Sequence, residues 1–598
     1  MRKARRTFYA LQERYNKKYH RIPAIVQEQI EREFDAIEQA IANEERKEAI
    51  RRLKKLANGI LKKSLWEQLR ENGFALLAAL GIAIIIRQMG FELYEIPTGS
   101  MRPTFKEKDR LLTSKTFFGW NLPLTASHIF FNPERVMRNS IITFTGKGLD
   151  IRDVDTKYFY LFPGKKQFVK RVIGKPGDVL YFYGGKIYGI DAQGKDISQE
   201  LQMFDIEHIP FIDFVRKTRF DGNIITFYQM NLPIAKLHCA RSGFQFGEML
   251  DRDGAAKDIY ELWGMGNFAM ARLLTHKELE ALAPNDAQNL EDGRLYLEIK
   301  HHPSIAAAQI KSDEFGNLYP FMGVKTSFIP LQEEHLRALW SHMETSRFHV
   351  KDGIAYCHEH SSLFGQVLPG IPDGCYEFFS GKGYSVHWEG IVEELPHTHP
   401  LMQFSPERLQ TFFNLGIVWD VRFHPIASDQ RLIPNRYAYF RDGDLYLLGA
   451  PILKKGDPVL NTFLEREKAH SYPFVDRGPP LTQEGLLDVA FVQRNGLPVP
   501  AKMYLLLGDN HANSGDSREF GFVPEGNLRG SPILLFWPFG KRFGFPLQAV
   551  PQGVNMYTAI FWGIVGGAIV TITWIRKRKR MQLLDYAKRN RHRDGISI

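Results

Sequence analysis

The stretch QFVKRVIGKPGD, residues 167–178, decides the fold class, because it predicts a short β-strand that runs into a tight turn. Residues 168–173 are mostly β-branched or aromatic, whereas Lys175–Asp178 hold proline and glycine. Lys170 stands among apolar neighbours in this strand. A half-buried lysine loses hydration of its charged form, so its pKa falls and its neutral amine can accept a proton. A surface lysine is the ordinary alternative.

A second segment, IPTGSMRPT at residues 96–104, offers a nucleophile. Pro97, Gly99 and Pro103 make a helix unlikely there. In a tight loop, Ser100 could present both its hydroxyl and its own backbone N–H to a substrate carbonyl. Taken alone, a loop rich in proline, glycine and serine is usually a linker.

A third segment, LLLGDNHANSGDSREFGFVP at residues 505–524, predicts an apolar strand followed by a turn. Its Gly, Asp, Asn and Ser residues suit a turn, since their side chains satisfy backbone groups and fix unusual dihedral angles. Asp516 and Arg518 are spaced to pair with each other or with neighbouring loops. A purely structural turn is the alternative.

Two apolar runs predict membrane anchors. Residues 556–575 form an uncharged run of 20 residues, and five basic residues follow at 576–580. The first run, residues 74–91, is strictly apolar only to Ile86, and Arg87 would extend it by reaching towards lipid headgroups. A buried helix of a soluble domain is the alternative for this shorter run.

The charge distribution predicts the orientation of the chain. Residues 1–72 carry 18 basic and 11 acidic side chains, and residues 576–598 carry 9 and 2, so each tail has a net charge of +7. The whole chain carries +11, so residues 73–575 sum to −3 and the basic character resides in the two tails. Basic residues beside apolar runs indicate the cytoplasmic side. We therefore expect both tails in the cytoplasm and residues 92–554 across the membrane, with no cleavable signal peptide and no nucleic-acid partner.

The cysteines and histidines do not predict a metal site. Cys239, Cys357 and Cys375 are scattered, so they allow at most one disulfide and are expected to be mainly buried thiols. The pairs His301-His302, His358-Glu359-His360 and His397-Thr398-His399 lack the spacing of a zinc protease. Gly264-Met265-Gly266 is only half of a dinucleotide-binding fingerprint.

The three segments, in this order after an anchor, resemble type I signal peptidase of bacteria. The family's serine motif matches residues 98–104, its lysine motif matches 169–178, and its Gly-Asp-Asn…Asp-Ser-Arg motif matches 508–518. Archaeal and eukaryotic relatives carry a histidine where this chain has Lys170. The resemblance implies a mainly β fold with an antiparallel catalytic core.

The resemblance also implies roles for individual residues. Ser100 would be the nucleophile and Lys170 the general base, with Ser514 orienting the lysine amine. The Thr98 hydroxyl and the Ser100 N–H would form the oxyanion hole. Supporting roles fall to Asp516 and Arg518, and structural ones to Arg171, Asp509 and Asn510. Neither a cofactor nor a metal is implied.

The chain departs from the family's pattern in three places. Asn139-Ser140 replaces the Gly-Asp that opens a strand motif at 139–144, and Lys108 replaces a glycine before Asp109. The third departure is the long spacing between Asp178 and Gly508, which predicts a β-rich or α+β insertion. The expected organisation is a helical region at 1–73, anchors at 74–91 and 556–575, core parts at 92–183 and 500–550, the insertion at 184–499, and a basic tail at 576–598.

These observations predict a multi-pass serine endopeptidase of the inner (plasma) membrane that removes signal peptides from exported preproteins. Its expected partners are secretory preproteins, the lipid bilayer and the protein-export machinery. Two other readings stay open. One is a non-catalytic or bifunctional scaffold whose insertion binds proteins, and the other is a Ser-Lys protease that cleaves itself or a regulator.

Overall fold

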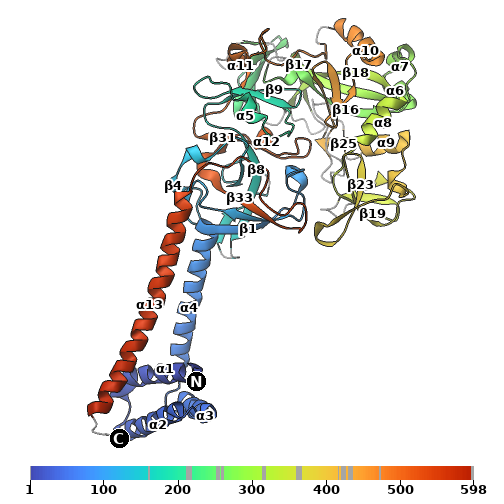
Figure 1. Ribbon diagram of the computed structural model, residues 1–598. Helices are drawn as coiled ribbons and strands as arrows, with labels where there is room; N and C mark the ends of the chain where they lie inside the picture. Colours follow the sequence, from blue (N-terminus) through green and yellow to red (C-terminus); the bar gives the residue numbers. More distant parts are fainter. Residues whose placement is uncertain are drawn as a thin grey trace. The chain divides into compact units, whose positions relative to one another are not determined.

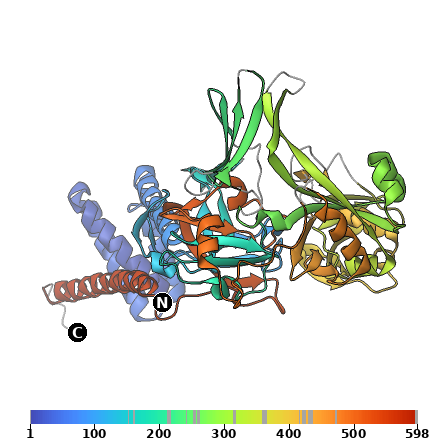
Figure 2. The same ribbon diagram turned by 90° about the horizontal axis from the view of Figure 1, so that it is seen from above.

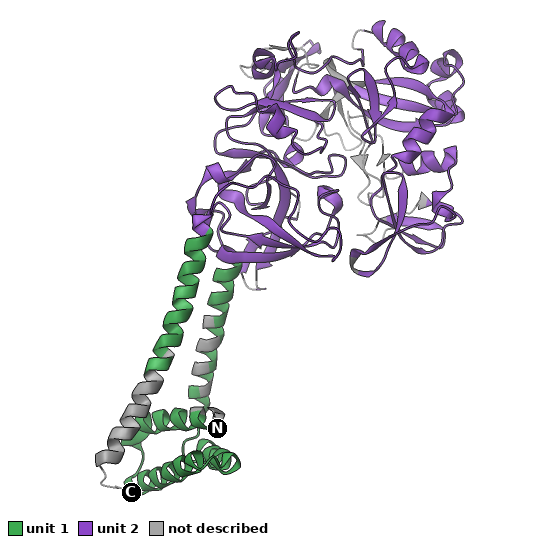
Figure 3. Ribbon diagram, viewed as in Figure 1, with its two compact units in different colours: residues 1–87, 558–598 green, residues 88–557 purple. Residues whose placement is uncertain are grey.

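The computed structural model describes residues 2–593 apart from 152, 159, 161, 211–217, 241, 251–255, 258–261, 313–317, 358–365, 415–416, 419–425, 428–435 and 471–472. The chain forms two compact units (Figure 3). The first comprises residues 1–87 and 558–598, and the second comprises residues 88–557. The tripeptide His358–His360 lies outside the described residues.

The first unit begins with three helices, α1 (Arg2–Lys18), α2 (Ala24–Ala42) and α3 (Arg46–Asn58). Each places apolar residues at helical spacing, and these side chains meet in one small core. Phe8 and Phe34 pack edge to face at its centre. The helical region expected at residues 1–73 thus contains three helices before the first apolar run.

The helix that carries the first apolar run, α4 (Leu65–Ile85), starts well before residue 74. The Ser64 hydroxyl accepts from the Glu67 N–H, while the Glu67 carboxylate accepts from the Ser64 N–H, and this reciprocal cap fixes the helix start. A helical turn at Ile86–Gly90 follows. A sequence reading based on hydropathy alone misses such a polar first turn.

One helix in the described part of the chain is long and apolar enough to cross a membrane. It is the segment Met556–Ile575 of α13 (Met556–Arg593). The first predicted anchor, 74–91, corresponds to the end of α4, where only the shorter stretch Ala79–Gly90 qualifies as an apolar helix. The length criterion therefore supports one anchor.

The second unit is built on a seven-stranded antiparallel sheet in the order β1-β2-β33-β5-β8-β31-β32 (Figure 1). Its strands come from both ends of the unit, so the insertion must leave and re-enter this sheet. Their bounds are β1 Phe91–Glu95, β2 Arg110–Ser114, β5 Ile141–Thr145, β8 Gln167–Gly174, β31 Met503–Leu507, β32 Val523–Pro524 and β33 Leu528–Trp537.

Strand β5 is buried at every position, because apolar clusters pack on both faces of the sheet there. A smaller sheet, β10-β9-β30, stands where the insertion departs and returns. Its strands are β9 Val179–Tyr183, β10 Lys186–Ile190 and β30 Leu497–Pro498. Short strands complete the core: β3 Gly119–Asn121, β4 His128–Phe131, β6 Asp155–Tyr158 and β7 Phe162–Lys165.

Among its described residues, the insertion contains three larger antiparallel sheets. The first is β11 Thr218–Asp221, β12 Ile224–Gln229, β13 Leu232–Cys239, β14 Gln245–Leu250 and β15 Ala256–Lys257. The second is β16 Phe268–Leu274, β17 Leu295–Ser312, β18 Leu318–Leu331, β27 Tyr437–Arg441, β28 Asp444–Leu447 and β29 Ala450–Leu453. Figure 2 shows the long β17–β18 hairpin beside the first of these sheets.

The third sheet of the insertion matters most for the site. It consists of β19 Phe348–Lys351, β20 Ile354–Cys357, β21 Gln366–Val367, β22 Gly374–Phe379, β23 Lys382–Val386 and β24 Val392–Glu394. A two-stranded piece, β25 Ile417–Val418 with β26 Ile426–Ala427, is also present. One large apolar cluster joins the second and third sheets.

Short helices cover these sheets. They are α5 Ser198–Leu201, α6 His276–Leu282, α7 Pro284–Asn289, α8 Glu333–Ser341, α9 Pro406–Asn414, α10 Pro458–Lys468, α11 Val489–Asn495 and α12 Ser517–Phe520. The mainly β, antiparallel prediction is confirmed.

Candidate active site

Ser100 lies in a single 3₁₀ turn, Gly99–Met101, that follows strand β1. The side chain and backbone of Asn510 hold this turn from outside. Its Nδ2 donates to the Gly99 carbonyl oxygen at 3.2 Å, and its backbone N–H donates to the Ser100 carbonyl oxygen at 3.2 Å. Both carbonyl groups are therefore held in place, and the Ser100 residue is half-buried.

Strand β8 delivers Lys170 to this hydroxyl. Lys170 lies opposite Ile142 of β5 in the antiparallel register, and its side chain extends to the Ser100 turn. The Lys170 Nζ donates to the Ser100 Oγ at 2.6 Å. The two residues that the sequence analysis paired across 70 positions are thus in direct contact.

The surroundings of Lys170 favour its neutral amine. The residue is only 4% exposed, and no carboxylate in the described part of the chain forms an ion pair with it. Burial lowers the pKa of Lys170 to about 8, although the nearby Asp516 carboxylate raises it in part. An amine with this pKa can act as a general base at mildly alkaline pH.

Asp516 and Arg518 form a buried pair behind the lysine. Arg518 donates to the Asp516 carboxylate through Nε at 2.9 Å and Nη2 at 2.8 Å. The same carboxylate accepts from the Gly508 N–H at 3.0 Å, so it links the beginning and the end of the loop between residues 508 and 516. Burial alone raises the pKa of the Asp516 carboxyl, but Arg518 holds it below its usual value.

Arg171 ties the lysine strand to the third segment. Its guanidinium donates to both oxygens of Asp509, through Nε and Nη2, at 2.7 Å each. Arg171 also donates to the Asn139 carbonyl oxygen at 2.7 Å, and Thr104 donates to Asp509 at 2.5 Å. A fully buried bidentate pair of this kind fixes β8 and the loop after β31 in one geometry.

The other two predicted site residues, Ser514 and Thr98, differ in their burial. Ser514 is buried, and its Oγ has no hydrogen-bond partner among the described residues. It packs against Gly508, where an added Cβ would lie 2.1 Å from the Ser514 Oγ and 2.5 Å from the Ser100 carbonyl oxygen. Thr98 is exposed and extended directly before the Ser100 turn.

The segment after α5 supports the loop from behind, which the sequence analysis did not anticipate. His511 contacts the Glu207 carbonyl oxygen through Nδ1 at 3.1 Å, and burial lowers its pKa. Burial also lowers the pKa of the neighbouring His208 to about 3. Both histidines are therefore neutral at physiological pH and serve as packing residues. No local sequence pattern indicates this role.

The two small departures from the family's pattern share one backbone feature. Asn139 has φ of 63° and Lys108 has φ of 72°, so both occupy the left-handed region where glycine is unstrained. This backbone conformation explains why the family has glycine at both positions, because glycine adopts it without strain. Asparagine tolerates this region, whereas lysine stores a modest strain there.

The described residues bring one metal-like group together, Glu334, His335 and Asp457. Both imidazole nitrogens of His335 are already engaged. Nδ1 accepts from the Gln332 N–H at 3.1 Å, and Nε2 donates to Asp457 at 3.0 Å. His335 and Asp457 cap two helices, and in this arrangement neither nitrogen of His335 has a free lone pair for a cation. Of the other histidine pairs, His301 is buried and His399 caps a 3₁₀ turn.

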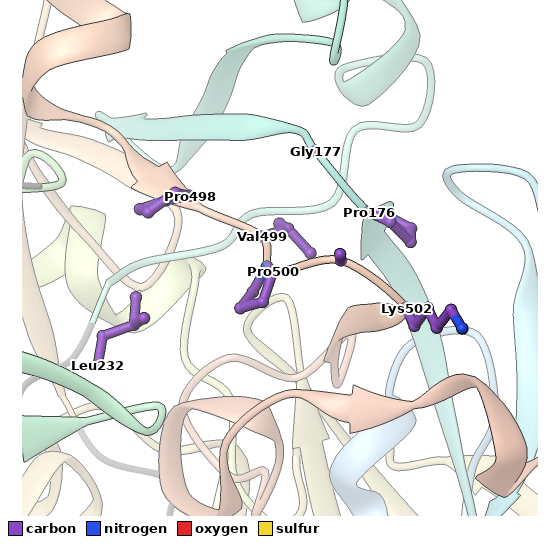
Figure 4. Close-up of a pocket in the computed structure, with 8 residues that line it drawn as sticks. Pro176, Gly177, Leu232, Pro498, Val499, Pro500 and Lys502 are labelled. Atoms are coloured by element: carbon purple, nitrogen blue, oxygen red, sulfur yellow. The ribbon is translucent and has the colours of Figure 1, made fainter.

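Cys239 and Cys375 are free thiols, each partly buried. Figure 4 shows a pocket of about 480 Å³ whose lining includes neither Ser100 nor Lys170. Its lining comes from the turn after β8 and from the segment before β31, with Leu232 at one side. Prolines and apolar side chains dominate it, and Lys502 is its single charged residue. The pocket therefore carries no catalytic group.

Comparison with known proteins connects this geometry to a family. The sequence profile described as "Signal peptidase, peptidase S26" matches residues 69–207 and 440–537. Signal peptidase I of Leptolyngbya laminosa is 30% identical over 167 residues, which cover 24% of this chain and 82% of the relative. Residues 208–439, between the matched segments, lie inside the expected insertion.

Two further relatives are similar over shorter stretches. The probable signal peptidase I-1 of a Synechocystis strain is 28% identical over 137 residues, covering 23% of this chain and 58% of the relative. Signal peptidase I of Buchnera aphidicola subsp. Baizongia pistaciae is 34% identical over 94 residues, covering 14% and 30%. The chain belongs to the signal peptidase family, peptidase S26, and is a protease that cleaves signal peptides.

Proposed function

We propose that Ser100 and Lys170 form the catalytic dyad of a membrane-bound signal peptidase that acts on exported preproteins. The observation that carries this proposal is the 2.6 Å contact between the Lys170 Nζ and the Ser100 Oγ at an amine whose pKa burial lowers to about 8. A nucleophile within hydrogen-bond reach of a poised base is the arrangement that acyl transfer requires.

The proposed reaction proceeds in two stages. The neutral Lys170 amine takes the Ser100 proton while the Oγ attacks the scissile carbonyl carbon, and the protonated amine then gives this proton to the leaving nitrogen. Water next attacks the acyl-enzyme, with Lys170 again as base. The mature protein leaves first and the signal peptide second.

The oxyanion is assigned to the Ser100 N–H and the Thr98 hydroxyl. The Ser100 N–H belongs to the 3₁₀ turn that Asn510 fixes, so its direction is set before substrate arrives. Thr98 is exposed and can turn its hydroxyl towards a bound carbonyl. Ser514, with a buried hydroxyl that has no other partner among the described residues, is proposed to orient the lysine amine once substrate closes the site.

The substrate is proposed to bind as an added strand. Strand β1 is an edge of the seven-stranded sheet and leads directly into the Ser100 turn. A cleavage region aligned along β1 would pass its scissile carbonyl to Ser100. Small apolar side chains before the cleaved bond are expected to fit the apolar cluster of Ile96, Met101 and Leu535.

Both predicted anchors belong to this proposal. Residues 556–575 meet the length of a membrane span, and α4 with residues 74–91 is proposed to cross as a second one. Both termini would then be cytoplasmic and the catalytic unit periplasmic at the inner membrane. Anchoring confines enzyme and membrane-bound preprotein to two dimensions, which favours their encounter. The protein-export machinery is the proposed neighbour of both.

The test is cleavage of a purified secretory preprotein by the full chain in detergent. Wild type should cut at the signal-peptide junction, while Ser100→Ala should not. Ser385→Ala, which alters a half-buried serine on β23 of the insertion, is the matched control and should cleave as wild type does. A non-catalytic scaffold predicts no cleavage by any of the three, and a self-cleaving protease predicts fragments of the chain itself.

A further inference from the structure

A buried charge cluster joins the nucleophile turn to the segment that the family profile leaves unmatched, residues 208–439. Arg102, two residues after Ser100, donates through Nε to Glu107 at 3.0 Å and through Nη2 to Glu377 at 2.7 Å. Glu377 lies on β22 of the insertion and is fully buried. Its carboxylate therefore reaches the catalytic core from 275 positions away in sequence.

Glu377 is the acceptor that three cations share. Besides Arg102, Lys106 donates to it through Nζ at 2.9 Å, and Arg347 donates through Nε at 2.7 Å. Arg347, which comes just before β19, also donates to the Glu107 carbonyl oxygen at 2.9 Å. Two residues of the insertion, Glu377 and Arg347, thus form hydrogen bonds with the 102–107 segment.

The charges explain why Glu377 cannot be replaced by a neutral residue without cost. Burial raises the pKa of its carboxyl, but Arg102, Arg347 and Lys106 outweigh burial and hold the pKa well below the usual range. The carboxylate is therefore always charged. Without it, three buried or half-buried cations would face Glu107 alone, and buried charges without partners are strongly unfavourable.

The cluster also touches the backbone beside the nucleophile. A Cβ added to Gly99 would lie 2.7 Å from Glu107 Oε1 and 3.1 Å from Arg102 Nε. The Arg102 N–H donates to the Gly99 carbonyl oxygen at 3.1 Å and closes the turn around Ser100. Asn510 holds the same turn from the other side. The turn is therefore clamped between the family's own loop and the insertion.

We infer that Glu377 is a positioning residue for Ser100, acting through Arg102. The insertion thereby helps to hold the active site of this chain in place. This role rests on the proposed function of Ser100. It follows that loss of Glu377 should move the hydroxyl relative to Lys170, and small displacements of reacting groups cost catalysis far more than binding.

The experiment compares Glu377→Gln with Glu467→Gln in the full chain. Glu467 is an equally buried insertion glutamate, paired with Lys325 at 3.0 Å and bonded to Ser327, within a cluster of its own. For Glu377→Gln, kcat on a preprotein should fall at least about tenfold with KM unchanged within about twofold. Glu467→Gln should lower thermal stability without this fall in kcat.

Arg102→Gln is the second variant and keeps the test decisive if Glu377→Gln does not fold. It leaves Lys106 and Arg347 against Glu107 and Glu377, a balanced set, while removing the link to the Ser100 turn. It should show the same loss of kcat at unchanged KM. A kcat within twofold of wild type in the folded variants, or an equal loss in Glu467→Gln, overturns the inference.

The proposed function and the positioning role of Glu377 can be refuted separately. If Ser100→Ala is inactive while Glu377→Gln and Arg102→Gln cleave as wild type does, the proposed function stands and the positioning role falls. If wild type does not cleave, or Ser100→Ala does, the proposed function falls and the positioning role falls with it.

Discussion

The seven-stranded sheet buries two lysines in opposite surroundings. Lys170 on β8 is 4% exposed, contacts the Ser100 hydroxyl and forms no ion pair in the described part of the chain. Lys115, directly after β2, is 2% exposed and lies 2.8 Å from the Glu92 carboxylate, with Tyr94 and Gln167 as further acceptors. Burial alone does not produce a base. What matters is whether burial comes with a countercharge.

The difference predicts opposite consequences for the same substitution. Replacing Lys170 by the apolar isostere should remove chemistry and spare the fold, because a buried amine without a countercharge contributes little to stability. Replacing Lys115 should do the reverse, because its loss leaves a buried carboxylate behind. If the proposed dyad is correct, the two substitutions are expected to separate catalysis from stability within one sheet.

The largest effect is expected for Lys170→Met. Without a base at the Ser100 hydroxyl, kcat/KM on a preprotein should fall by at least about 10⁴-fold. The free energy of unfolding should stay unchanged or rise, as measured by urea denaturation in detergent. A variant that cleaves within tenfold of wild type would show that another group takes the serine proton.

Lys115→Met is expected to destabilise the catalytic unit by about 3–5 kcal/mol, because Glu92 is left buried without its lysine. At a temperature where the variant is folded, most of its cleavage rate should remain. The same urea titration measures the loss. A neutral effect would mean that Tyr94 and Gln167 satisfy the carboxylate by themselves.

The difference between the surroundings of Lys170 and Lys115 is visible in the structure but not in the sequence. Local sequence motifs singled out Ser100, Lys170 and the loop at 508–518 as candidates, because each motif is short and contiguous. They did not flag Lys115, whose partner Glu92 lies on the neighbouring strand. They also could not reach Glu377, because pairing across 275 positions depends on how the insertion folds back. The start of α4 at Leu65 was missed because a polar capping box, not hydropathy, sets it.

The pH dependence of cleavage tests the state of Lys170 directly. Its pKa is lowered to about 8, and only the neutral amine accepts the serine proton, so the active form grows as pH rises. Between pH 6 and pH 7, kcat/KM should therefore increase about tenfold, between pH 7 and pH 8 about fivefold, and above about pH 9 it should level off. A profile that is flat over this range, or that falls towards alkaline pH, would contradict a lysine base.

A third lysine extends the comparison to the surface, where the smallest effect is expected. Lys108 is exposed and pairs with Glu95 at 2.9 Å, yet its backbone has φ of 72°. Exposed ion pairs contribute about 0–1 kcal/mol, whereas a left-handed residue with a Cβ costs about 1–2 kcal/mol relative to glycine. The backbone should outweigh the charge, so Lys108→Gly should raise the free energy of unfolding by up to about 1 kcal/mol. Lys108→Ala loses the same ion pair but keeps the Cβ, so it isolates the backbone. If the glycine variant is no more stable than the alanine variant, strain at this position is not what the family's glycine relieves.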